Sequence, residues 1–215
     1  MHNNHTQNIQ LWEYGFRHGL TFAQIIHRME HNLQKATLAA LNEQEKRYLE
    51  YTRLNFQRIR KWQKIYRPEP SVRNIFRAIS ETILFLVISE DWCGDAAQVV
   101  PCLHQLVAEN SRLHLRFLDR DTHPQIMNCF LTEGKRSIPV IIGVHPDGSV
   151  LFRWGPRPKP AETLYQQARS QQLPQQVILH RLHTWYARDH CRTAESEWAE
   201  LLSMALFKDS NPANG

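Results

Sequence analysis

The pattern of apolar and polar positions indicates four strands in the middle of the chain. Residues 83–89 form a continuous apolar run, ILFLVIS, whereas residues 112–119 alternate between apolar and polar side chains. The first pattern is typical of a strand buried on both faces, and the second of a strand with one buried face. Residues 139–154 indicate two more strands around the Pro-Asp-Gly turn at 146–148, which predicts a hairpin.

Helical patterns separate these strands. Helices are expected over residues 71–79, from about 93 to 110, over 123–134 and from about 161. Gly134 is placed to end the third of these helices. The resulting order is β-α-β-α-β-β-α, which is an α/β fold. Because a β-α-β step needs a right-handed crossover, the first two strands should be parallel.

The segment before the strands is expected to be helical throughout residues 1–67. One short helix is predicted over about 21–31. A second begins at Asn42, with Glu45 three positions later in the spacing of a capping box, and runs until the RPEP sequence at 67–70. Its apolar positions recur near helical spacing, so it should dock on the domain that follows.

The segment after the strands is also expected to be helical, over about residues 174–207. The sequence therefore divides into an N-terminal helical extension (1–69), a central domain (70–170) and a C-terminal helical extension (171–215).

Composition narrows the class of protein. The chain has 215 residues, of which 42% are hydrophobic and 22% charged, which is ordinary for a globular protein and excludes a disordered chain. No apolar run reaches the ~18 residues of a membrane-spanning helix. The polar N-terminus has neither the basic nor the apolar region of a secretory signal, so a cytoplasmic location without membrane association is expected.

The net charge of +5 and the pI of about 9.2 raise the question of nucleic acid. The clustered basic residues lie in RIRKWQK, at 58–64, on a predicted helix. A solvated helix face accounts for them better than a nucleic-acid surface, and no nucleic-acid motif is recognised.

The cysteines do not form a metal or disulfide framework in sequence. Cys93, Cys102, Cys129 and Cys191 are scattered, and no two are separated by two residues. Reduced thiols are therefore expected. The histidines are dispersed as well, so neither a metal nor another cofactor is predicted.

Residues 89–101, SEDWCGDAAQVVP, contain the strongest chemical signal. Cys93 directly follows the first predicted strand and begins a predicted helix. Pro101 lies eight residues later, Pro139 precedes the third strand, and Gly155 follows the hairpin.

The order of the elements and the positions of this cysteine, the two prolines and the glycine resemble those of the thioredoxin fold, over about residues 70–170. The resemblance implies a central mixed sheet flanked by helices, with extra helices at both ends of the chain. It also implies that Pro139 is a cis-proline opposite the cysteine, and that the backbone of Ile138 is available to pair with an extended substrate. The WCGDA sequence, RSIP and the helical tail resemble a bacterial subgroup of thioredoxin family proteins.

Two positions depart from this pattern. Ala96 stands where thioredoxins have their second, resolving cysteine, and Val87 stands where they have a buried acid. A dithiol cycle within the motif is therefore excluded, and Cys93 is the one candidate catalytic residue.

The start of a helix favours an anion and lowers the pKa of a thiol there, whereas the carboxylate of Asp95 opposes a thiolate. A modest net lowering of the Cys93 pKa is expected. The remaining candidate site residues surround Cys93 in the motif or in the cis-proline element: Trp92, Gly94, Asp95, Ala96, Ile138 and Pro139. Trp92 fits equally well as a packing lid and as a shield beside the sulfur.

Three polar residues outside the motif are candidates for a cleft. Asn55 and Arg58 follow Thr52 in a polar row at i, i+3 and i+6, which suits either a solvated stripe or a row facing a cleft. Arg136 suits two roles. It is either an ordinary exposed side chain without a binding function, or a group that binds a thiolate or an anionic thiol.

The other cysteines are poor candidates to resolve an intermediate on Cys93. Cys102 lies nine residues further along the same predicted helix, on its opposite side and roughly 13 Å along its axis, which is too far for a disulfide. Cys129 and Cys191 are interpreted as packing residues.

Two functions remain open. The first is a monothiol thiol-disulfide oxidoreductase, in which Cys93 attacks a protein disulfide or a low-molecular-weight thiol adduct and an external thiol resolves the intermediate. The second is a redox-inactive binding module that uses the groove around Trp92 and Pro139. A peroxidase of the peroxiredoxin type is disfavoured because position 90 is a glutamate.

Overall fold

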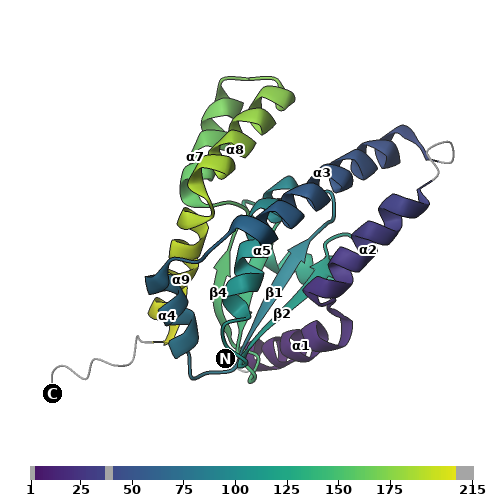
Figure 1. Ribbon diagram of the computed structural model, residues 1–215. Coiled ribbons are helices and arrows are strands. Elements are labelled where there is room, and N and C mark those ends of the chain that lie inside the picture. Colours follow the sequence, from purple (N-terminus) through teal and green to yellow (C-terminus); the bar gives the residue numbers. More distant parts are fainter. Residues whose placement is uncertain (1–2, 37–40, 207–215) are drawn as a thin grey trace, which may run out of the picture.

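The computed structural model describes residues 3–36 and 41–206 and has a four-stranded mixed sheet at its centre (Figure 1). The strands lie in the order β2-β1-β3-β4. Their bounds are β1 (Ile83–Ser89), β2 (Leu113–Asp119), β3 (Val140–Val144) and β4 (Val150–Trp154). β1 pairs parallel with β2 and antiparallel with β3, and β3 pairs antiparallel with β4. The predicted parallel pair and the predicted hairpin are therefore confirmed.

Helices cover the sheet and extend beyond it (Figure 1). They are α1 (Asn3–His18), α2 (Phe22–Lys35), α3 (Glu43–Ile65), α4 (Pro70–Ala78), α5 (Gly94–Val107), α6 (Pro124–Met127), α7 (Lys159–Ser170), α8 (Gln175–Asp189) and α9 (Arg192–Leu206), with a 3-10 turn, η2 (Asn128–Phe130). No helix in the described part of the chain has both the length and the apolar character needed to cross a membrane.

The capping box predicted at the start of α3 is confirmed. The Asn42 side chain accepts hydrogen bonds from the backbone N–H groups of Gln44 and Glu45, and the Glu45 carboxylate accepts from the Asn42 N–H. These bonds satisfy N–H groups that have no partner within the helix, which fixes where α3 begins. Trp62, near the other end of α3, is 2% exposed and anchors the helix in the core.

The two faces of the sheet are covered by different helices. Because side chains alternate along a strand, Leu84 and Leu86 of β1 face one side and Phe85 the other. Gly15 of α1 lies against the side chains of Leu84 and Leu86. Phe76 of α4 stacks on Phe85, with 6.0 Å between ring centroids. The core of the central domain is therefore built between helices from the N-terminal extension and the helices that follow it.

The helix predicted over residues 123–134 is too long, because helical structure ends at Phe130. The segment forms only α6 and η2, and Thr132 then pairs with Lys135 in a turn in which Gly134 has a φ of +73°. Arg153 of β4 donates hydrogen bonds to the Phe130 carbonyl and to the Thr132 hydroxyl. The first bond occupies a carbonyl oxygen that a continuous helix would use, and both bonds attach the segment to β4 at the edge of the sheet.

Candidate functional site

Cys93 lies where the sequence places it, between β1 and α5, but its sulfur is buried. The residue is the N-cap of α5 and is 6% exposed. Its thiol donates a hydrogen bond to the Ile138 carbonyl oxygen at 3.4 Å. Ala96, at the position of the missing second cysteine, is 8% exposed. The site is thus a single thiol inside the protein, with no second sulfur beside it in the motif.

The pKa of Cys93 is raised to about 12. Burial is the main cause, and the negative charge of Asp95 adds to it; the N–H groups of Ala96 and Asp95 and the Ser89 hydroxyl act in the opposite direction. The predicted lowering of this pKa is therefore wrong, because loss of hydration outweighs the helix N-terminus. At neutral pH the group is a thiol, and the thiolate is the form that attacks disulfides.

The N-terminal helices hold the loop that precedes Cys93. Arg28 of α2 forms ion pairs with Asp91 at 2.7 Å and with Asp119, at the end of β2, at 2.6 Å. Asn55 of α3 is 1% exposed and donates to the Asp91 carbonyl oxygen at 3.0 Å. Arg58 donates to the Asn55 side-chain oxygen at 2.9 Å. The polar row of α3 therefore faces the loop that precedes Cys93, and it covers this loop from solvent.

The C-terminal part of the chain covers the other side of the same loop. Asp95 forms an ion pair with Arg157 at 2.8 Å, and it accepts a hydrogen bond from the Tyr186 hydroxyl of α8 at 2.9 Å. Gly94 lies under His183 of α8, since a Cβ atom added to Gly94 would be 3.0 Å from the His183 ring. Burial, with the nearby Arg58 charge, lowers the pKa of His183 to about 4, so its ring is neutral. These partners of the motif were not recognised from sequence, because they lie far from it in the chain.

Trp92 forms part of an aromatic and basic platform beside the buried thiol. Its ring stacks on Tyr48 of α3, with 4.9 Å between centroids and 11° between planes. The guanidinium of Arg120 lies over the same ring at 4.9 Å. Arg136 does not reach Cys93 in this arrangement: it donates to the Arg120 carbonyl oxygen at 2.6 Å and pairs with Asp121 at 3.3 Å. Its side chain thus supports the platform.

The predicted cis-proline is confirmed at the Ile138–Pro139 bond, and a second cis bond joins Gly155 to Pro156. Gly155 has a φ of +113°, and a Cβ atom there would lie 2.2 Å from the Pro139 carbonyl oxygen. Ile138, however, is 7% exposed, and its carbonyl already accepts the Cys93 hydrogen bond. The resemblance implies that the Ile138 backbone is free to pair with an extended substrate. In this structure the Ile138 carbonyl is not free, because it is hydrogen-bonded to Cys93.

Two hollows adjoin these elements. A cavity of about 40 Å³ next to Cys93 is lined by residues that include Phe22, Met29 and Ser89. It is far smaller than ligand pockets, which measure roughly 300–1,000 Å³. A cleft of about 540 Å³ adjoins the cis-proline element, and its lining includes Ser137 and Gly155. Four basic and two acidic side chains line this cleft: Lys135, Arg157, Lys159, Arg169, Glu133 and Glu162.

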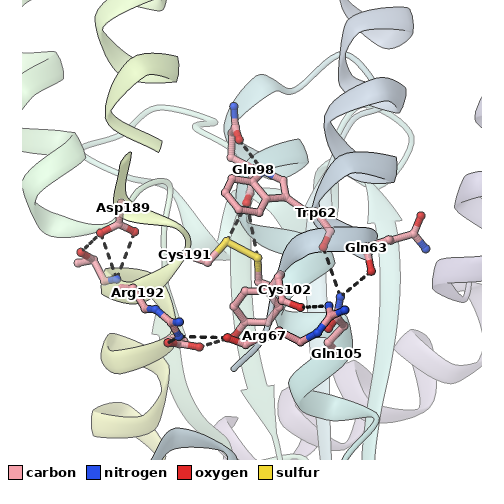
Figure 2. Close-up of a disulfide and its surroundings, with 12 residues drawn as sticks. Trp62, Gln63, Arg67, Gln98, Cys102, Gln105, Asp189, Cys191 and Arg192 are labelled. Carbon is pink, nitrogen blue, oxygen red and sulfur yellow. Dashed lines mark hydrogen bonds and ion pairs between the residues drawn. A yellow bond between two sulfur atoms is a disulfide. The ribbon is translucent and has the colours of Figure 1, made fainter. Parts of the chain in front are cut away.

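The expectation that all four cysteines are reduced is wrong. Cys102 of α5 forms a disulfide with Cys191, just before α9, with 6.7 Å between their Cα atoms (Figure 2). Cys191 is therefore not a simple packing residue. Cys129 is not one either, since it is exposed and free. Spacing gave no signal of the bridge, because the two cysteines are 89 positions apart.

The sheet order, the cysteine at the start of α5 and the cis-proline opposite it define a thioredoxin-like protein. The profile of the Thioredoxin_9 family, described as thioredoxin, matches residues 41–169, which is more than half of the chain. The chain belongs to this thioredoxin family. Its finer placement in a bacterial subgroup with a WCGDA motif remains a prediction.

Comparison with solved structures supports the fold alone. A protein of unknown function from Pseudomonas aeruginosa, PA1234, is similar with a TM-score of 0.57 and 14% identity, over 88% of this chain and 95% of that one. An HIV epitope-scaffold is similar with a TM-score of 0.57 and 14% identity, over 90% of this chain and 98% of that one. The search of curated proteins gave no significant match.

The burial of Cys93 predicts an unusual pH profile for its alkylation. In a Cys129→Ser variant with the disulfide intact, we expect the iodoacetamide rate at Cys93 to keep rising up to at least about pH 10, because only the thiolate reacts. Asp95→Asn should shift the profile to lower pH, since it removes a negative charge beside the sulfur. Peptide mass spectrometry measures both profiles. A plateau below about pH 8 would contradict the buried, protonated thiol.

Proposed function

We propose that this protein is a thioredoxin-fold binding module that does not cycle its thiol in the conformation described. The observation that carries the proposal is the state of Cys93, which is 6% exposed with a pKa raised to about 12. A group with this pKa is almost entirely protonated at neutral pH, and its small adjoining cavity leaves no room for a thiol substrate. What remains accessible around the motif is a binding surface.

The binding surface runs from the aromatic platform to the polar cleft. Trp92 carries Arg120 over its ring, and Arg120 exchanges hydrogen bonds with Arg136 through their side chains and backbone carbonyls. Arg136 precedes Ser137, which lines the cleft, and Lys135 lines it as well. The platform and the cleft are therefore joined by one short segment, residues 135–137.

The chemistry of this surface indicates a polypeptide partner with acidic and apolar side chains. Tryptophan, tyrosine and arginine are the residues that contribute most to protein interfaces, and the platform consists of Trp92, Tyr48 and Arg120. The cleft has an excess of basic side chains, which would pair with acidic residues of the partner. An apolar partner residue would contact the part of the Trp92 side chain that Tyr48 and Arg120 leave uncovered.

Selection from a phage-displayed peptide library tests the proposal. Peptides selected on the wild-type protein should be rich in acidic and apolar residues. Cys93→Ser should leave their affinity unchanged, because the thiol takes no part. Trp92→Ala should weaken binding by about tenfold or more, the loss typical of truncating an interface hot spot. Fluorescence anisotropy of labelled peptides measures these affinities.

A charge-matched pair of variants controls for non-specific attraction to a basic protein. Lys135→Glu/Lys159→Glu changes the cleft, whereas Arg53→Glu/Lys64→Glu makes the same change in net charge on exposed positions of α3. The cleft pair should weaken binding and the α3 pair should not. Equal losses in both pairs would refute a role for the cleft. A loss in Cys93→Ser but not in Trp92→Ala would refute the module and favour thiol chemistry.

The monothiol oxidoreductase remains a second candidate because of one observation. The N–H groups of Asp95 and Ala96 and the Ser89 hydroxyl all lower the pKa of Cys93. The Ser89 hydroxyl is buried and makes no hydrogen bond that meets ordinary geometry. These groups would stabilise a thiolate if the cover over Cys93 were removed. Turnover of a glutathionylated peptide with external glutathione, lost in Cys93→Ser, would support this candidate.

A further inference from the structure

One stripe of α5 joins the cysteine motif to the C-terminal helices at three points. Asp95 accepts a hydrogen bond from Tyr186, and the Gln98 side chain bonds to the His183 ring at 3.1 Å. Cys102 completes the stripe through its disulfide to Cys191. Positions 95, 98 and 102 follow the i, i+3, i+7 spacing of a single helix face. Two of the three attachments are polar contacts with α8, and the third is covalent.

The disulfide lies at a junction with an unfavourable backbone. His190 and Cys191, between α8 and α9, have φ values of +55° and +64°. Neither is glycine, and two consecutive non-glycine residues in the left-handed region are strained. Cys191 also packs against the Gln98 carbonyl, and the ring of His190 lies edge-on to Trp62, at 5.9 Å between centroids. Figure 2 shows the bridge enclosed between α5 and this junction.

The two helices that meet at the junction are attached to the protein very differently. α9 is fixed by buried Glu195, which accepts a hydrogen bond from the Tyr66 hydroxyl, and by Trp198, which packs on Trp154 at 5.3 Å. α8 pairs with α7 in a hairpin that projects away from the sheet (Figure 1). Loss of the bridge would therefore free α8 rather than α9.

We propose that Cys102 and Cys191 form a second redox site, a clamp whose oxidised state keeps α8 closed over Gly94 and Asp95, the two residues that follow Cys93. Reduction by a dithiol breaks the S–S bond: two electrons and two protons pass from the dithiol to the cysteines, which become two thiols, and the reductant becomes a disulfide. The strained junction then relaxes, and His183 and Tyr186 move away from Gly94 and Asp95. The access of reagents to Cys93 thus depends on the oxidation state of a distant pair.

The clamp is tested by the alkylation rate of Cys93 at fixed pH, in a Cys129→Ser background. Both bridging cysteines are buried, so the oxidised protein is compared with protein treated with dithiothreitol under native conditions, and with Cys102→Ala/Cys191→Ala. A bridge that dithiothreitol leaves intact in the folded protein would overturn the clamp. Iodoacetamide labelling of the Cys93 peptide is followed by mass spectrometry. We expect labelling about tenfold faster or more in the reduced protein and in the double variant. In both, Cys93 becomes accessible through local opening of α8, whereas in the oxidised protein it becomes accessible only through rarer unfolding of a larger part of the structure.

Leu106→Ala provides the matched control. Leu106 is a fully buried residue of α5, so its truncation destabilises the protein while the disulfide stays intact. Labelling of Cys93 in this variant measures the acceleration that destabilisation alone produces, and the reduced protein and the double variant should exceed it. Equal rates in oxidised and reduced protein would overturn the clamp, as would acceleration by Leu106→Ala to the level of the double variant. The clamp would also be overturned if the oxidant diamide failed to re-form the disulfide in the reduced protein, a change that mass spectrometry detects as the loss of two hydrogens.

The outcome is separable from that of the binding module, whose readout is peptide affinity at Trp92. A protein that binds peptides but shows no redox dependence at Cys93 loses only the clamp. A protein with the redox dependence but no peptide affinity loses only the module.

Discussion

Replacement of both bridging cysteines in Cys102→Ala/Cys191→Ala is expected to lower the free energy of unfolding by about 4 kcal/mol, because the bridge closes a very long loop. The two residues are 89 positions apart, and cross-linking so long a segment removes much of the conformational freedom of the unfolded chain. For a chain of this size the change corresponds to a fall in melting temperature of roughly 8–16 °C. Chemical and thermal unfolding under non-reducing conditions measure it.

The control for this prediction is Cys129→Ala, which removes an exposed, unpaired cysteine. Its unfolding midpoint should match that of the wild type. Under a strong reductant the wild type should approach the stability of the double variant, since both then lack the cross-link. If the double variant and the oxidised wild type unfold at the same midpoint, the bridge contributes nothing to the folded state.

The second large effect is expected from Arg157→Met. Arg157 pairs with Asp95 at 2.8 Å, and their side chains are 14% and 12% exposed. Removing the arginine leaves a buried carboxylate with the Tyr186 hydroxyl as its remaining side-chain partner, and breaking a buried pair in this way costs about 3–5 kcal/mol. Denaturant unfolding at neutral pH measures the loss.

Two further measurements identify the buried charge as the cause. The double variant Asp95→Asn/Arg157→Met should recover much of the loss, because it removes the charge that was left unpaired. Burial already raises the pKa of Asp95 in the wild type, and loss of Arg157 should raise it further. A raised pKa means that the folded state binds the proton more tightly, so the deficit of Arg157→Met should shrink as the pH falls. A deficit that is independent of pH and persists in the double variant would point to lost packing instead.

The parts of the fold that were predictable from sequence are those set by local pattern. The apolar run at 83–89 specified the central strand, and Asn42 with Glu45 specified the start of α3. The cis bond at Pro139 followed from the family resemblance. In each case the signal lies within a few residues of the structure that it determines, or in a motif shared by a whole family.

The chemistry at Cys93 was not predictable in the same way. The helix N-terminus is local, and it does lower the pKa of the thiol, but burial depends on residues far away in the chain. Arg28 and Asn55 come from the N-terminal extension, and His183 and Tyr186 come from the C-terminal one. The disulfide is equally non-local. A single sequence gives no distances between such segments. Neither the burial of the Cys93 thiol nor the disulfide could therefore be inferred from it.

The position of α5 between the two extensions has a consequence for how the protein opens. Trp62 of α3 donates a hydrogen bond to Gln98 on one side of α5, and Cys191 is bonded to Cys102 on the same helix. The boundaries at 69 and 170 divide the sequence by composition, but the packing crosses both of them. The slowest-exchanging amide hydrogens should therefore be distributed over α3, α5 and the central strands together, as one cooperative unit rather than a core with two appendages.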